Sequence, residues 1–248
     1  MKYLLSKASL SVVKRLAQER TLCAFDFDGT LSPIVEHPDR AGMRVRTRNL
    51  LHRLSLLYPC IIVSGRARAD VLCKLHGVNV ARVIGNHGAE TETAQDSRHR
   101  AARWKTILEL EIGPIPGMWM EDKGLSLAVH YRQSAQKAET RRQILAATRK
   151  LKHVQVFGGK QVVNVVMDGA PDKGDALAAE RDRMGCNWAL YVGDDENDEQ
   201  AFALGGNVVS VRIGRKLRSH AHYYLRSQTE IDGLLDSLVR LREPVVPM

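Results

Sequence analysis

The sequence predicts an α/β fold in which a doubly wound parallel sheet is interrupted by a smaller α+β domain. In residues 1–92 and 171–248, short apolar runs alternate with helical patterns, which is typical of a parallel sheet covered by helices on both faces. Between these segments, at 93–170, the order changes to helix, strand, helix, strand, strand. That order suits antiparallel pairing with helices on one face. We therefore expect a core built from both outer segments and a smaller cap domain inserted between them.

The outer segments contain the patterns that such a core requires. Apolar runs predict strands, the last of them at an edge of the sheet: 22–27, 60–63, 82–84, 188–192, 207–213 and 223–225. Apolar residues at helical spacing predict helices at 46–57, 69–75 and 230–241. The same spacing near the start predicts an amphipathic helix with an apolar face made of Leu4, Leu5, Ala8, Val12 and Leu16.

The inserted segment is predicted to pack helices on a small sheet. Its helical patterns cover 98–110 and 135–151. Strands are expected near Met118 and at 125–131, 154–157 and 161–167, the second of these half exposed. Gly158-Gly159 separates the last two strands and predicts a hairpin turn there.

The chain is basic, with a formal net charge of +9 over 248 residues. This charge fits nucleic acid, an anionic membrane surface or a small anionic substrate. The basic stretches 98–105 and 141–152 lack the interleaved aromatic residues of a single-strand binder, so solvated helix faces are the preferred interpretation. We therefore expect no nucleic-acid partner. We also expect no membrane partner, because no apolar run has the length of a bilayer span.

The cysteines are scattered along the chain, at Cys23, Cys60, Cys73 and Cys186. They form no CxxC pair and no spacing typical of zinc. Reduced thiols in a cytoplasmic protein are the expectation from this usage.

The string Phe25-Asp26-Phe27-Asp28-Gly29-Thr30-Leu31 places two carboxylates at the end of the first predicted strand. In open α/β sheets, ligands bind beyond the carboxyl ends of the strands. Asp26 can attack phosphorus to form an aspartyl phosphate. Asp28 can protonate the leaving oxygen and later activate water. A turn with two solvated aspartates is the plainer alternative, and the complete string argues against it.

Polar residues of other kinds occur in two further segments. Ser64, Gly65 and Arg66 follow the second strand and can offer a hydroxyl, backbone N–H groups and a guanidinium to phosphate oxygens. Lys173 stands just before a predicted helix and can offset the charge of a transferring phosphoryl group. Taken alone, Ser-Gly-Arg is a common loop and a weak signal, and the segment around Lys173 by itself favours a solvated lysine in a turn.

An acidic run, Gly193-Asp194-Asp195-Glu196-Asn197-Asp198-Glu199, follows the strand at 188–192. Its carboxylates repel one another unless a cation intervenes, and Mg²⁺ prefers oxygen ligands. Asp194, at the strand end, is the expected ligand. Asp195 and Asp198 are expected to orient waters or neighbouring groups. A solvated helix N-terminus, the alternative, accounts for only part of the run.

These segments, DFDGTL, SGR, a lysine and GDDEND, resemble the haloacid dehalogenase (HAD) superfamily of phosphatases in identity and order, over essentially the whole chain. The resemblance implies a Rossmann-like core and Mg²⁺ as cofactor. It implies that Asp26 is the nucleophile and Asp28 the acid/base. It also implies that Asp26, Asp194 and the backbone carbonyl of Asp28 are metal ligands.

Further strings resemble the trehalose-6-phosphate phosphatase family: GNHGAE at 85–90, EDKGLSLAVHYR at 121–132 and GDDENDEQAF at 193–202. The resemblance implies that His87 and Glu90 face the active site. It implies that Glu121 and Lys123, in the cap, contact sugar hydroxyls. The expected activity is Mg²⁺-dependent hydrolysis of trehalose 6-phosphate to trehalose and phosphate.

One departure from the family pattern concerns the substrate. Asn164 and Val166 stand where the family has a glutamate and a basic residue. This removes two charged contacts to the sugar. An enzyme rejects substrate analogues through polar groups at fixed positions in its site, so these two changes affect which sugar is accepted. Another sugar phosphate, such as glucosylglycerol phosphate or sucrose 6-phosphate, is therefore an alternative substrate.

Two alternatives change the activity. A phosphomutase is disfavoured, because its cap usually follows the first motif closely, whereas Leu31 and Ile61 leave room for little more than one helix and its loops. A basic nucleic-acid-binding protein on an inactive core is the non-enzymatic alternative. The complete set of acidic core positions argues against it.

Overall fold

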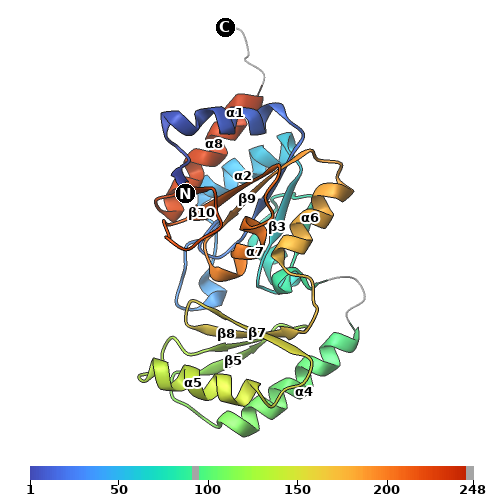
Figure 1. The fold of residues 1–248 in the computed structure, drawn as a ribbon, viewed down its shortest axis with the longest axis vertical. Helices are drawn as coiled ribbons and strands as arrows, with labels where there is room; N and C mark the ends of the chain where they lie inside the picture. The colour runs from blue at the N-terminus through green and yellow to red at the C-terminus, as the bar shows by residue number, and fades with distance from the viewer. Residues whose placement is uncertain (91–94, 244–248) are drawn as a thin grey trace.

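The computed structural model describes residues 1–90 and 95–243, and it shows a parallel core with a smaller antiparallel part beside it (Figure 1). In this described part the core sheet has seven strands, in the order β1-β11-β10-β9-β2-β3-β4, and each neighbouring pair is parallel. The strands are β1 (Lys2–Tyr3), β2 (Thr21–Phe25), β3 (Cys60–Val63), β4 (Arg82–Ile84), β9 (Trp188–Gly193), β10 (Val208–Ile213) and β11 (Tyr223–Leu225). The predicted fold class is confirmed.

Helices cover both faces of the core sheet. Successive strand residues point to opposite sides, so the apolar strands present an apolar surface on each face. Cys23 and Phe25 of β2 share one hydrophobic cluster with the first group of helices, while Leu22 and Ala24 share another with the second group. The first group is α1 (Leu10–Gln18), α2 (Val45–Leu57), α3 (Arg68–Lys74) and α8 (Ile231–Arg242). The second group is α6 (Lys173–Arg183) and α7 (Glu199–Phe202). Short 3₁₀ turns are η1 (Lys7–Ser9), η2 (Pro38–Arg40), η3 (Asn86–Gly88), η4 (Glu196–Asp198) and η5 (Gln228–Glu230).

Two expectations for the core were wrong. Strand β11 is not at the edge, because β1 pairs with it on its outer side. Leu4 and Leu5 are not helical, since the helix begins only at Leu10. The backbone N–H groups of Lys2 and Leu4 donate to carbonyls of the β11 segment, at 3.0 and 3.1 Å, so the extended chain satisfies donors and acceptors that a free edge would leave open.

The cap, as we call the antiparallel part, packs two helices on one face of a sheet. In the described residues this sheet has the order β5-β6-β8-β7. The elements are α4 (Gln95–Ile112), β5 (Trp119–Asp122), β6 (Leu127–His130), α5 (Lys137–Thr148), β7 (Val154–Gly159) and β8 (Val162–Met167). Figure 1 shows the cap sheet lying between α4 and α5 and the core.

The limits of the cap remain a proposal. Its expected start at 93 lies outside the described residues, and its expected end at 170 falls between β8 and α6. The expected half-exposed strand is instead buried along Leu127, Ala128 and Val129, because the helices cover one face of the cap sheet and the core lies opposite the other.

The hairpin between β7 and β8 turns later than expected. Gly158 and Gly159 are paired residues of β7, and the turn consists of Lys160 and Gln161. Gln161 takes the left-handed conformation, with a φ of 64°. This shift places Lys160 at the tip of the hairpin.

The cysteines and the two basic stretches lie in the structure as follows. All four cysteines are free; Cys73 is exposed and the others are buried. None of the described helices is both long enough and apolar enough to cross a membrane. Arg103 and Arg141, from the two basic stretches, lie on exposed positions of α4 and α5.

Candidate active site between core and cap

The carboxyl ends of four adjacent parallel strands form the core side of the candidate site. The strands β9, β2, β3 and β4 are neighbours, so the residues that follow them meet at one edge of the sheet. Asp26 follows β2 and extends its pairing, with its backbone N–H donating to the carbonyl of Val192 at 2.9 Å. Arg66 follows β3, His87 follows β4 and Asp194 follows β9.

A pocket lies between this edge and the cap. Most of the predicted site residues line it: Asp26, Asp28, Gly65, Arg66, His87, Glu121, Lys123, Asp194 and Asp195. Lys173 and Asp198 are not among its lining residues, but both are buried directly beside Asp26 or Asp194. The structure therefore brings together residues from five separate sequence segments of the core and from the cap.

Ser64 and Glu90 do not line this pocket. The Ser64 hydroxyl is buried and accepts a hydrogen bond from the backbone N–H of Arg66 at 3.2 Å. The Glu90 carboxylate accepts hydrogen bonds from the backbone N–H of Arg68 at 2.7 Å and from Asn86 Nδ2 at 3.2 Å. Both side chains are engaged in shaping the loops after β3 and β4, and their contact with substrate stays a prediction.

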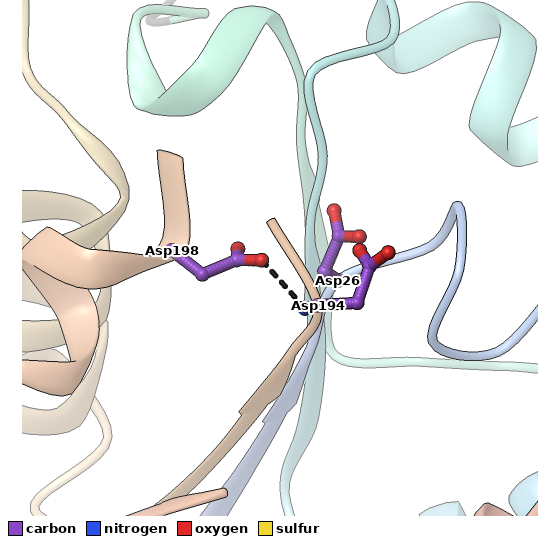
Figure 2. A group of neighbouring side chains, drawn as sticks. All are labelled: Asp26, Asp194 and Asp198. Carbon is purple, nitrogen blue, oxygen red and sulfur yellow. Dashed lines mark hydrogen bonds between the residues drawn. The ribbon is translucent and has the colours of Figure 1, made fainter. Parts of the chain in front are cut away.

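Three buried carboxylates gather where a metal ion is expected. One oxygen each of Asp26, Asp194 and Asp198 lies within 4.8 Å of the others. In Figure 2 the carboxylates of Asp26 and Asp194 lie close together, while Asp198 reaches towards the backbone of Asp194 from η4. Asp198 accepts hydrogen bonds at 2.7 to 2.9 Å from Lys173 Nζ, from Tyr191 Oη and from the backbone N–H groups of Asp194 and Asp195. These bonds suit a positioning role for Asp198 and leave Asp26 and Asp194 as candidate ligands.

The surroundings of Asp194 fit a cation. Burial raises the pKa of Asp194 to about 6, although the Lys160 ammonium opposes this rise. The contact with Lys160 Nζ shows that the position already attracts positive charge. A Cβ added at Gly29, whose φ is 81°, would lie 2.0 Å from Asp194 Oδ2, so glycine is required beside the carboxylate. The oxygen ligands and negative charge are those that Mg²⁺ prefers.

Lys173 neutralises the buried acids. Its Nζ lies 2.8 Å from Asp26 Oδ1 and 2.7 Å from Asp198 Oδ1. Burial opposes the charge of Lys173, yet the two carboxylates raise its pKa above the ordinary value. Burial also raises the pKa of Asp26, an effect that Lys173 counteracts and the neighbouring acids strengthen. Lys173 therefore keeps the candidate nucleophile in place and favours its ionised form.

Replacing Lys173 by methionine should lower the free energy of unfolding by roughly 3–5 kcal/mol, because it leaves buried charges uncompensated. Urea denaturation without added metal measures this change. Lys216→Met is the matched control. Lys216 pairs with Glu196 at 3.2 Å on the surface, where such pairs contribute about 0–1 kcal/mol. Equal unfolding midpoints and slopes for the two variants would contradict the role given to Lys173.

Arg66 holds Asp28 in place. Its Nε and Nη2 donate to the two oxygens of Asp28 at 2.6 and 2.8 Å, which is a bidentate pair. The same guanidinium donates to Asp70 at 2.5 Å and to the backbone carbonyl of Pro38 at 3.0 Å. The fork expected for a phosphate is thus directed at Asp28, and Arg66 orients that carboxylate at the rim of the pocket.

His87 is a neutral polar group in the wall of the pocket. Burial lowers its pKa well below the ordinary value, and nearby Lys123 and Lys173 lower it further. Its Nδ1 lies 3.1 Å from Asn197 Nδ2, and its buried Nε2 has no protein partner. A Cβ on Gly65 would approach the imidazole to 2.4 Å, so Gly65 makes room for this ring.

The polar face of the cap sheet covers the pocket, and the alternation of strand residues decides which side chains reach it. Trp119 and Glu121 of β5 lie on this face, and Lys123 continues it with Nζ donating to the carbonyl of Gly65 at 2.8 Å. On β8, Asn164 lines the pocket. Val166 lines a smaller neighbouring pocket instead, so the departure at Asn164 bears more directly on the ligand.

Sequence reasoning assigned no role to several lining residues: Trp119, His130, Arg132, Lys160 and Asn197. Trp119 is two positions before Glu121, so the alternation of side chains along one strand could have placed it on the same face as Glu121. No sequence signal could have placed Lys160 in the pocket, because its position depends on where the hairpin turns. Arg212 of β10 was also missed; it donates to the carbonyls of Asp194 and Asp195 at 2.6 and 3.0 Å and supports the acidic loop.

Comparisons with known proteins identify relatives of this chain. The family profile described as trehalose-phosphatase matches residues 24–224. A trehalose-phosphate phosphatase of Mycobacterium avium is 35% identical over 218 residues, covering 80% of this chain and 55% of the relative. One of Mycobacterium bovis is 32% identical over 215 residues, covering 80% and 54%. The chain therefore spans about half the length of these curated relatives.

Solved structures show the same fold. The C-terminal domain of trehalose-6-phosphate phosphatase from C. albicans superimposes with a TM-score of 0.80 at 21% identity, over 93% of this chain and 96% of that one. A trehalose-6-phosphate phosphatase related protein has a TM-score of 0.73 at 23% identity, over 89% and 97%. A HAD subclass IIB sugar phosphatase, BT4131, has a TM-score of 0.60 at 14% identity, over 89% and 98%. The profile match, which covers most of the chain, shows that it belongs to the trehalose-phosphatase family.

Proposed function

We propose that this protein is a Mg²⁺-dependent phosphatase that hydrolyses trehalose 6-phosphate, with Asp26 as nucleophile. The observation that carries the proposal is the convergence of Asp26, Asp28 and Asp194 in one pocket beneath the polar face of the cap. Two relatives named trehalose-phosphate phosphatase, at 32 and 35% identity, support the choice of substrate.

The chemistry follows from the positions of the side chains. Asp26 attacks phosphorus, forming an aspartyl phosphate while the bond from phosphorus to the sugar oxygen breaks. Asp28 gives a proton to the leaving oxygen, and then takes one from the water that hydrolyses the aspartyl phosphate. Asp26 and Asp194 would hold Mg²⁺, which supplies positive charge for the phosphoryl oxygens. The cap would keep bulk water from the site, and Glu121 and Lys123 would contact sugar hydroxyls.

Asn164 favours a second candidate, a phosphatase for a different sugar phosphate. It lies in the pocket where the family has a glutamate, so one charged contact to the sugar is replaced by an amide. The cytoplasmic location and the absence of a nucleic-acid partner stay predictions.

The test is a panel of phosphate esters with Mg²⁺ and with EDTA. We expect trehalose 6-phosphate to exceed glucose 6-phosphate, sucrose 6-phosphate and glucosylglycerol phosphate by at least about tenfold in kcat/KM, or about 1.4 kcal/mol. EDTA should silence turnover and Mg²⁺ should restore it. If another ester is preferred, the proposed substrate is wrong but the phosphatase activity stands. Turnover without metal would refute the proposed metal site. If no ester is hydrolysed and the protein is retained on DNA in a salt-dependent way, the alternative of a nucleic-acid-binding protein on an inactive core is favoured.

A further inference from the structure

Trp119 is a large aromatic side chain that stays exposed inside a polar pocket. It begins β5, lines the pocket and keeps 40% of its surface accessible. Trp104, in contrast, is 5% exposed in the hydrophobic cluster of the cap. Ligand pockets commonly combine such aromatic surface with a few placed polar groups. The position of Trp119 therefore points to a ligand rather than to the core of the cap.

A neighbouring ring holds the indole in one orientation. Trp119 and His130 are partners across β5 and β6, and their rings stack with centroids 4.1 Å apart and planes 10° from parallel. His130 Nε2 in turn lies 2.8 Å from Glu121 Oε2. The imidazole covers one face of the indole, while 40% of the Trp119 surface stays accessible. Because the ring is fixed in advance, binding would cost little ordering of this side chain.

The indole lies at the end of the pocket away from the phosphoryl site. Trp119, His130, Val162 and Gly159 form one row across the cap sheet. Three strand spacings, ~14 Å, separate the two ends of this row. Gly159 precedes Lys160, whose ammonium contacts Asp194. Trp119 therefore lies at the opposite end of this row from the residue that precedes Lys160.

Apolar groups of the core add to the pocket that Trp119 lines. Ile34, which is 41% exposed, and Val35 line the same pocket as the indole. The C–H face of a pyranose ring is apolar, whereas its hydroxyls point outward around the rim. A flat aromatic surface in a pocket with aliphatic groups suits that face, and the carboxylate of Glu121 in the same pocket suits the hydroxyls.

We propose that Trp119, backed by His130, is a stacking platform for the sugar ring farthest from the phosphate. The group that this platform would contact is a second sugar ring, which trehalose 6-phosphate has and glucose 6-phosphate lacks. This inference deepens the phosphatase function proposed above and rests on it.

Kinetics of Trp119→Ala and Trp119→Phe test the platform. The alanine variant should lose at least tenfold in kcat/KM for trehalose 6-phosphate, mostly through KM, and less than threefold for glucose 6-phosphate. The phenylalanine variant should recover most of the loss, because it restores an aromatic face. Leu110→Ala, an exposed apolar residue of α4 outside the pocket, is the control and should change neither substrate. Equal losses for both substrates in Trp119→Ala would overturn the proposal.

A binding measurement separates this inference from the phosphatase proposal. Unphosphorylated trehalose should change the tryptophan emission of the wild type, and Trp119→Phe should abolish that change. Glucose should need at least tenfold higher concentration for the same effect. Identical responses of the wild type and Trp119→Phe would reject the platform even in an active enzyme. A wild type that responds to trehalose but hydrolyses no ester would keep the platform and reject the phosphatase.

Discussion

Asp26→Asn should abolish phosphate release, to below about one thousandth of the wild-type rate, since loss of a nucleophile removes nearly all covalent catalysis. The amide that replaces the carboxylate is neutral, so it is a poor nucleophile and a poor metal ligand. The fold should persist, because Lys173 retains its bond to Asp198 at 2.7 Å. Initial rates measure the loss, and thermal unfolding checks the fold.

Asp182→Asn is the control for Asp26→Asn. Asp182 belongs to α6, its side chain is 72% exposed, and it lies outside the pocket. The same chemical change should therefore leave the rate close to that of the wild type. Retention of even a few per cent of the wild-type rate by a pure, folded Asp26→Asn sample would remove Asp26 from its role as nucleophile.

Asp28→Asn should lower kcat by about 10²–10⁴-fold, the usual contribution of a positioned acid–base group. The asparagine can still accept a hydrogen bond from Arg66, but it can neither give up nor take the proton that the reaction moves. If hydrolysis of the intermediate becomes limiting, phosphate should accumulate on the protein. Quenched-flow trapping with a ³²P-labelled ester measures both the rate and the trapped species.

Asp70→Asn separates this chemical role from the ion pair. Arg66 donates to Asp70 at 2.5 Å as well as to Asp28, so each variant removes one carboxylate partner of the guanidinium. Asp70 is not among the residues that line the pocket. We expect less than a tenfold loss in Asp70→Asn. Equal losses in Asp28→Asn and Asp70→Asn would mean that only the charge around Arg66 matters.

Strand-end motifs were informative because parallel strands end at a common edge. Asp26, Arg66, His87 and Asp194 are far apart in the sequence, yet each lies within three residues of the end of a strand. The order β9-β2-β3-β4 makes those strands neighbours, and the motifs then meet without further information from the loops. The cap was less predictable, because one shift of its hairpin turn, from Gly158-Gly159 to Lys160-Gln161, changes which side chain reaches Asp194.

The fold class and the group of acids at the strand ends could be predicted from the order of amino acids alone. How each polar group is used depends on contacts between segments that are distant in the chain. Asp198 is satisfied by hydrogen bonds, Arg66 is directed at Asp28, and Glu90 is directed at a loop backbone. Periodicity reports which face of an element is apolar, but a hydrogen bond depends on the distance between atoms. Lys173 and Asp26 are 147 residues apart in the chain and 2.8 Å apart in space, and no local pattern encodes that contact.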